Sequence, residues 1–228
     1  MQFGLIEMWH AMGLLVKLVA MLLFSLSVIT IYLFIERQFI FFRARTLSKQ
    51  VAPKLADLLK EGQLKEALNF SSKKEYRKSH LARVTAAGIQ EFIEGKEAYL
   101  SLEKQVETAQ RGSERAAVIY TQELKRGLNV LASIATSAPF IGLFGTIFGI
   151  INAFRGMALT GSGGIGAVAQ GIAEALVATG VGIGVAIIAL WCYNSLTTRI
   201  DTFCAEMANT SSQIVDFFIR KKEEGKSS

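Results

Sequence analysis

Three long stretches without charged side chains constrain this sequence more than any other feature. They cover residues 18–35, 127–154 and 175–196. Each approaches or exceeds the roughly 20 residues that an α-helix needs to cross the hydrocarbon core of a bilayer. Only 19% of the residues are charged and 51% are hydrophobic, which also favours a membrane protein. The sequence therefore predicts an all-α integral membrane protein with three transmembrane helices.

The charged segments between these stretches set the predicted domain boundaries. A cleaved signal peptide is the alternative for the first stretch, but residues 1–16 carry Glu7, lack Lys and Arg, and are followed by no small-x-small cleavage site. We expect, in order, a periplasmic or interfacial segment 1–17, a transmembrane helix 18–35, a cytoplasmic helical domain 36–128, a transmembrane helix 129–155, a periplasmic loop 156–167, a transmembrane helix 168–196, and a cytoplasmic C-terminal helix and tail 197–228.

Lysine and arginine are distributed unevenly along the chain. Of 25 such residues, 18 lie between Glu36 and Leu128, five follow Leu196, and the other two are Lys17 and Arg155. Because basic loops remain in the cytoplasm, this bias predicts a periplasmic N-terminus and a cytoplasmic C-terminus. Topology thus accounts for the net charge of +6, and no basic stripe interleaved with aromatic residues indicates nucleic-acid binding.

Local signals predict where helices start and stop in the charged segment. This segment mixes 18 basic with 12 acidic residues, which is typical of exposed helices. Pro53 and Gly62 predict a short helix over residues 54–61, because proline suits a first turn and glycine follows a last one. Ser72 and Glu75 have the spacing of a capping box, which predicts a helix start at this point.

Apolar residues at helical spacing join the charged segment to the spans. No strong breaker is evident after Ser101, so one helix is predicted from residue 101 to residue 154, about 80 Å long. The third span is predicted to continue through Ile200 and Phe217. Spans two and three would thus extend into a cytoplasmic helical bundle, whose apolar positions we interpret as packing residues and not as a ligand site.

Glu174, Thr146 and Thr179 are the candidate functional residues within the spans. An ionisable side chain inside a bilayer is costly and indicates function, but a carboxylate at a helix N-terminus near the interface is also stabilised by the helix dipole. Both interpretations of Glu174 stay open. The two threonine hydroxyls can bond their own helix, which is the more common case, or line a water path.

Glycines in the second and third spans have the small-xxx-small spacing of closely packed membrane helices. Gly145 and Gly149 form one such pair, and Gly180 and Gly184 form another. We therefore expect these four residues to lie at helix contacts.

No catalytic or metal-binding set accompanies these residues. Cys192 and Cys204 lack CxxC spacing, and His10 and His80 stand alone, so a zinc ligand set is missing. The sequence also lacks an HExxH motif, a phosphate loop and a dinucleotide fingerprint. It therefore predicts that the protein is not an enzyme. An intramembrane enzyme using Glu174 would need a second catalytic group.

Two motifs carry a resemblance to a known family. Residues 137–154 read SAPFIGLFGTIFGIINAF, and residues 171–182 read GIAEALVATGVG. In this order, with three spans, a short N-terminus and an insertion after the first span, the chain resembles the MotA/TolQ/ExbB proton channel family. It is more similar to the TolQ and ExbB branch than to MotA, which has four spans.

The resemblance implies a stator subunit of a motor in the bacterial inner membrane, driven by the proton-motive force. Five copies would form a ring around the single-span helices of two partners similar to TolR or ExbD, with protons as the coupling ion and no cofactor. The work would be TonB-dependent import, Tol-Pal maintenance or gliding, through a TonB-like, TolA-like or gliding effector. The alternative is a scaffold that anchors partners without conducting protons, and insensitivity to a protonophore would favour it.

The resemblance also implies roles for individual residues. Thr146 and Thr179 would line the inner ring near an aspartate of the partner, and Glu174 would lie near the subunit contacts and the pore. The positions that the family uses for helix bending and packing carry over to Pro139, Gly142, Gly145 and Gly149.

The sequence departs from the family pattern in the third span. Residues 185–189 read VAIIA where the family often has a proline, which puts the bend of that helix in doubt. Glu174 and Thr179, five residues apart, lie about 140° from each other on an ideal helix. Glu174 therefore need not share a face with Thr179.

Overall fold

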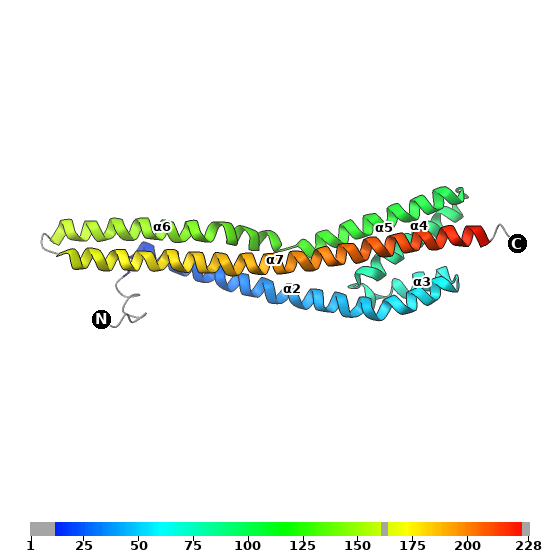
Figure 1. The fold of residues 1–228 in the computed structure, drawn as a ribbon, viewed down its shortest axis with the longest axis horizontal. Coiled ribbons are helices and arrows are strands. Elements are labelled where there is room, and N and C mark those ends of the chain that lie inside the picture. The colour runs from blue at the N-terminus through cyan, green and yellow to red at the C-terminus, as the bar shows by residue number, and fades with distance from the viewer. Residues whose placement is uncertain (1–11, 161–163, 225–228) are drawn as a thin grey trace. The chain divides into compact units, whose positions relative to one another are not determined.

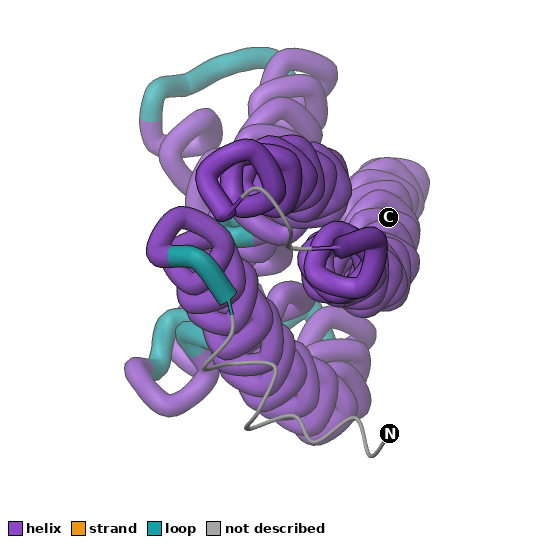
Figure 2. Tube along the Cα trace, turned by 90° about the vertical axis from the view of Figure 1, so that its left-hand side faces the viewer, coloured by secondary structure: helices purple, strands orange, loops and turns teal. Residues whose placement is uncertain are grey.

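The structure, a computed structural model, describes residues 12–160 and 164–224. These residues form helices and connecting loops without any β-strand (Figures 1 and 2). The predicted all-α class is therefore confirmed. The elements are α2 (Leu14–Lys60), α3 (Leu64–Ser71), the 3-10 helix η1 (Lys74–Tyr76), α4 (His80–Glu97), α5 (Leu102–Lys125), α6 (Leu128–Thr160) and α7 (Gly164–Glu224).

Three helices are long and apolar enough to cross a membrane. The segments that qualify by length and composition are Leu14–Lys60, Leu128–Ala158 and Val168–Arg220. They lie in α2, α6 and α7 and contain the three predicted spans. The number and order of the candidate spans agree with the sequence prediction.

The chain divides into two compact units. The apolar unit comprises Met1–Glu36 and Gly127–Leu196, and the charged unit comprises Arg37–Arg126 and Thr197–Ser228. Helices α2 and α7 contribute residues to both units. Helix α6 belongs to the apolar unit, whereas α3, η1, α4 and α5 belong to the charged unit.

The apolar unit packs parts of three helices around a small core. Its buried cluster takes one set of side chains from each helix: Val19 and Leu23 of α2, Ile134 and Ala138 of α6, and Val185, Ala186 and Ala189 of α7. Large apolar side chains also cover the outside, since Phe24, Phe140 and Trp191 are each 65% or more exposed. Such a surface suits lipid or neighbouring helices better than water.

The charged unit has a separate hydrophobic core. Its members come from all of its longer helices: Val51, Leu55, Ala67, Phe70, Ala82, Ile89, Phe92, Ala109, Ile214 and Phe218. Within this core the rings of Phe92 and Phe218 stack with their centroids 3.8 Å apart. The packing joins α4 to the C-terminal part of α7.

The end of α2 corrects one prediction and agrees with another. Pro53 lies inside α2, so the short helix predicted over residues 54–61 is wrong; the helix continues because Val51 and Leu55 on either side are buried in the core. Gly62 follows the helix with a φ of 74°. The amide of Gln63 donates to the carbonyl of Leu58, which is a Schellman ending.

The capping box predicted at Ser72 is also wrong. Ser72 is the C-cap of α3, and the next α-helix, α4, starts at His80. Its N-cap is Ser79, whose Oγ accepts a hydrogen bond from the amide of Ala82 at 3.2 Å. A serine cap is present, but seven residues further along the chain.

Gly127 interrupts the long helix predicted from residue 101 to residue 154. Helix α5 ends at Lys125 and α6 begins at Leu128, with Gly127 between them at a φ of 84°. This left-handed conformation is accessible to glycine and costly for other residues, so the helix stops here. In contrast, α7 runs without interruption from Gly164 to Glu224, as predicted for the third span.

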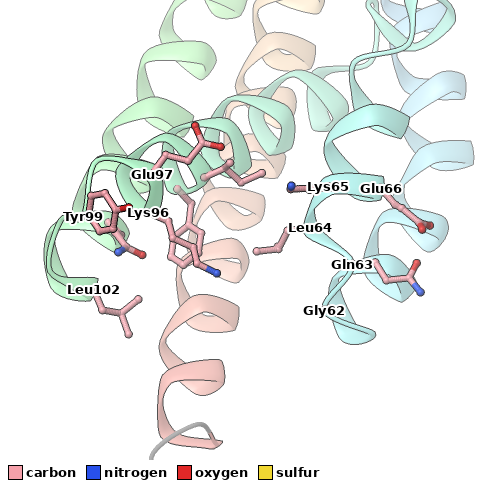
Figure 3. Close-up of a pocket in the computed structure, with 12 residues that line it drawn as sticks. Gly62, Gln63, Leu64, Lys65, Glu66, Lys96, Glu97, Tyr99 and Leu102 are labelled. Atoms are coloured by element: carbon pink, nitrogen blue, oxygen red, sulfur yellow. The ribbon is translucent and has the colours of Figure 1, made fainter.

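A pocket of about 820 Å³ lies in the charged unit (Figure 3). One wall comes from Gly62–Glu66 and the other from the end of α4 and the start of α5. Its charged residues balance, because Lys65 and Lys96 accompany Glu66 and Glu97. None of the residues predicted to function lines this pocket.

Candidate functional site: a buried threonine pair

Two threonine hydroxyls meet where α6 and α7 pack in the apolar unit. Thr146 of α6 is buried, Thr179 of α7 is half-buried, and their hydroxyls hydrogen-bond to each other. Thr146 Oγ1 also lies 3.2 Å from the carbonyl oxygen of Gly142 and 3.1 Å from that of Ala175. Because a hydroxyl has one proton, Thr146 can accept from Thr179 while donating to one of these carbonyls. The pair thus contacts both helices, so Thr146 is not confined to bonding its own helix.

Closely packed glycines bring α6 and α7 together around this pair. A Cβ on Gly142 would lie 2.9 Å from the carbonyl oxygen of Ala178, and one on Gly149 would lie 2.6 Å from the Cβ of Ala175. Helix α7 contributes Gly182, where a Cβ would lie 2.6 Å from the carbonyl oxygen of Ala138. These distances are shorter than ordinary contacts, so the two backbones approach each other because these positions lack side chains.

The other glycines of the predicted packing set have different surroundings. Gly145 lies against both α2 and α7, since a Cβ there would lie 2.9 Å from Val19 Cγ1 and 3.3 Å from the Cβ of Ala178. A Cβ on Gly180 or Gly184 would meet nothing within 4 Å. Within this chain Gly182, and not that pair, contacts α6. The packing role expected for Gly180 and Gly184 stays a prediction that requires a neighbouring helix.

Pro139 lies inside α6, and the helix continues through it. Two residues before it, Ser137 Oγ donates to the carbonyl oxygen of Ser133 at 2.7 Å. The helix remains intact although proline removes one backbone donor. Bending at Pro139 stays a prediction.

Glu174 precedes Ala175, whose carbonyl oxygen lies beside the threonine pair. The residue is half-buried, and its Oε1 accepts an exposed hydrogen bond from Gln170 Nε2 at 3.2 Å. Glu174 is the single carboxylate in the sequence between residues 124 and 200. The arrangement combines hydroxyls, which exchange protons without carrying charge, with one acid a short distance along α7.

A second polar cluster, in the charged unit, could not be found from the sequence. His80 is fully buried, its Nδ1 lies 3.0 Å from Ser48 Oγ, and its Nε2 lies 2.6 Å from Glu206 Oε2. Ser48 Oγ in turn lies 2.8 Å from Ser79 Oγ. A neutral His80 with its proton on Nε2 satisfies every member of this chain of hydrogen bonds. Burial lowers the pKa of His80, and the hydrogen bond to Glu206 opposes that shift.

No local pattern predicts the His80 cluster, because His80 and Glu206 are 126 positions apart in the sequence. The cluster joins α2, α4 and α7 and has a structural role. His10, the other histidine noted in the sequence, lies outside the described residues. The described part of the chain contains no group of three or more His, Cys, Asp or Glu side chains placed to hold a metal ion.

An ion pair in the charged unit contacts a buried tyrosine. Arg83 donates from Nη1 and Nη2 to the Glu123 carboxylate, and its guanidinium lies 4.8 Å from the ring centroid of Tyr120. The hydrogen bond from Arg83 lowers the pKa of Glu123. Burial raises the pKa of Tyr120 to about 12. This group positions α4 against α5 and lies outside the candidate site.

A membrane-spanning helix bundle with a hydroxyl pair at its helix contact has clear relatives among known proteins. The sequence profile of the MotA/TolQ/ExbB proton channel family matches residues 76–209, which include both threonines and Glu174. The chain therefore belongs to the MotA/TolQ/ExbB proton channel family.

Individual relatives carry the names ExbB and TolQ, as expected for the TolQ and ExbB branch. Biopolymer transport protein ExbB of Salmonella typhimurium is 32% identical over 91% of this chain and 83% of its own length. Tol-Pal system protein TolQ of Haemophilus influenzae is 27% identical over 91% of this chain and 90% of its length. ExbB of Pseudomonas putida is 32% identical over 91% of this chain. That protein is longer, and the match covers 61% of its length.

Proposed function

We propose that this chain is the stator subunit of an inner-membrane motor driven by the proton-motive force. Family membership supports the class, and the hydrogen-bonded pair Thr146 and Thr179 at the α6–α7 contact is the observation that carries the mechanism. In this proposal five copies surround two single-span partner helices similar to those of ExbD or TolR. Protons are the coupling ion, and no cofactor is required.

The proposed mechanism assigns each polar group one task. The spans offer hydroxyls and a single acid, Glu174, and no series of titratable groups across the membrane. A carboxyl group from the partner fits this gap, because its neutral form crosses an apolar wall at much lower cost than a charged one. Thr146 and Thr179 would exchange the proton with that group, and Glu174 would act on the outer side.

The driving force is sufficient for mechanical work. Moving one elementary charge through 100 mV is worth about 2.3 kcal/mol. Each proton that passes the threonine pair would therefore bias the position of the partner helices by an energy several times the thermal energy. The proposed output is work at the cell envelope, through TonB-dependent import, Tol-Pal maintenance or gliding.

The test uses single substitutions in the whole complex. The complex is purified through a tag on this chain and reconstituted into liposomes that contain a pH-sensitive dye. Thr146→Val, Thr179→Val and Glu174→Ala should each reduce proton flux at least tenfold while the complex still assembles. Thr136→Val is the matched control, because the Thr136 hydroxyl is exposed and bonds carbonyls of its own helix. Full flux in all three test variants would refute the pathway. Envelope activity insensitive to a protonophore would favour a scaffold.

A further inference from the structure

A second polar feature of the apolar unit is a pocket of about 450 Å³ in which α2, α6 and α7 take part. Four polar side chains line it: Asn152 and Arg155 from α6, and Gln170 and Glu174 from α7. In a unit whose surface is otherwise rich in large apolar groups, this concentration is unusual. At about 30 Å³ for each water molecule, the volume holds on the order of ten waters, and the lining provides partners for them.

The lining of the pocket includes a residue that contacts the threonine pair. Gly149 and Ala175 line it at the place where α6 and α7 touch, and a Cβ on Gly149 would lie 2.6 Å from the Cβ of Ala175. The carbonyl oxygen of Ala175 lies 3.1 Å from Thr146 Oγ1. Ala175 therefore both lines the pocket and contacts the hydroxyl pair through its carbonyl oxygen.

Two polar side chains of the pocket have defined positions. Gln170 lies one helical turn before Glu174 and donates from Nε2 to Glu174 Oε1 at 3.2 Å. Asn152 lies against the start of α2, since a Cβ on Gly13 would be 2.8 Å from Asn152 Nδ2. The residues that line the pocket thus come from a single chain.

We propose that this pocket is a water-filled vestibule leading from the outer face to the threonine pair, and that Gln170 is a positioning residue that holds the Glu174 carboxylate toward it. This proposal rests on the proposed function. To that function it adds a route within one subunit and three polar residues, Asn152, Arg155 and Gln170. The species that it takes are water and transferable protons. One carboxylate accompanied by Arg155 does not supply the set of oxygen ligands that hard metal cations require.

Thiol labelling tests the vestibule without any transport measurement. In a background with Cys192→Ala and Cys204→Ala, single cysteines are introduced as Asn152→Cys in the pocket and as Ile151→Cys and Phe154→Cys on neighbouring positions. Ile151 and Phe154 are 43% and 51% exposed on this chain and do not line the pocket. Thiols react as thiolates, which form in water and not in an apolar surrounding.

The expected result is a labelling rate at residue 152 at least ten times that at residues 151 and 154, with a membrane-impermeant cationic thiosulfonate added from the outer side. Gln170→Cys gives a second pocket position if Asn152→Cys fails to assemble. Equal or slower labelling at the pocket positions would overturn the proposal, and so would labelling only from the cytoplasmic side.

The positioning role of Gln170 has its own readout. Gln170→Leu removes the hydrogen-bond donor to Glu174 Oε1 and should therefore change the pH profile of proton flux. Gln170→Asn, which keeps an amide, should reverse part of that change. An unchanged pH profile in Gln170→Leu would overturn this role. Rapid labelling at residue 152 together with full flux in the threonine variants would leave the vestibule intact and refute the proposed function instead.

Discussion

The contact at Gly142 allows the most direct test of how α6 and α7 are held together. A Cβ at this position would lie 2.9 Å from the carbonyl oxygen of Ala178, 3.0 Å from the Cα of Thr179 and 3.3 Å from the Cα of Gly182. All three atoms belong to the backbone of α7, so no side chain can rotate out of the way. Gly142→Ala must therefore separate the two helices.

The size of the effect follows from these distances. Ordinary contacts with a Cβ begin near 3.4 Å, so the helices must separate by about 0.5 Å at this point. Overpacking of this kind costs about 1–3 kcal/mol, whereas alanine gains about 1 kcal/mol over glycine from helix propensity. Gly156→Ala in the same helix gains the propensity term and meets nothing within 4 Å. The two variants should therefore differ in their free energy of unfolding by the full overpacking cost.

Thermal unfolding of the detergent-solubilised protein, followed by loss of helical signal, measures this difference. For a chain of this size 1 kcal/mol corresponds to roughly 2–4 °C, so Gly142→Ala should melt on the order of 5 °C below Gly156→Ala. Proton flux should also fall in Gly142→Ala alone, because Thr146 lies one turn from the forced separation. Equal melting temperatures would refute the close approach of the two backbones.

Three further predictions concern the charged unit and the break before α6. Because burial lowers the pKa of His80, the unfolded chain binds more protons between that lowered value and about 6.5, and stability should fall as the pH drops through this window. Melting temperatures measured from pH 7.5 to pH 5 should fall less steeply within this window in His80→Gln than in the unsubstituted protein. An unchanged slope would contradict the assignment. Arg83→Gln removes a partly exposed ion pair with Glu123, so it should lower the free energy of unfolding by at most about 1 kcal/mol in low salt. The loss should be smaller in 1 M salt, and melting at both salt concentrations measures the difference. Gly127→Ala forces alanine to a φ of 84° and should destabilise by about 1–2 kcal/mol, with Gly127→Asn closer to wild type in the same assay.

The spans were predictable because their signal is local and strong. A stretch without charge must either enter lipid or be buried, and three such stretches lie in α2, α6 and α7 as expected. The continuity of α7 was predictable for a similar reason, since its apolar residues keep helical spacing beyond the span. Hydropathy and periodicity therefore define most of the fold without any knowledge of long-range contacts.

The errors occurred where tertiary packing outweighed a local signal or where a local signal was overlooked. Pro53 normally ends a helix, but burial of Val51 and Leu55 maintains α2 through it. Gly127 is a helix-breaking residue that was overlooked because apolar residues keep helical spacing on both sides of it. In the site, Thr146 and Thr179 were candidates because they carry hydroxyls within the spans and belong to the family motifs, whereas their direct hydrogen bond joins residues 33 positions apart, which no local rule describes.

The packing around the threonine pair restricts which parts of the proposed motor can move. Gly142, Gly149 and Gly182 hold α6 and α7 at distances at which even one added methyl group would collide with the neighbouring helix. A closely packed interface of this kind does not slide continuously, because each small displacement loses contacts on one side and produces clashes on the other. The hydroxyl pair is therefore fixed in position, as a pre-organised site should be. If protons drive motion past this pair, we expect the displacement to occur between the α6–α7 pair and a helix of another chain, and a cross-link that joins α6 to α7 within one subunit should leave proton flux intact.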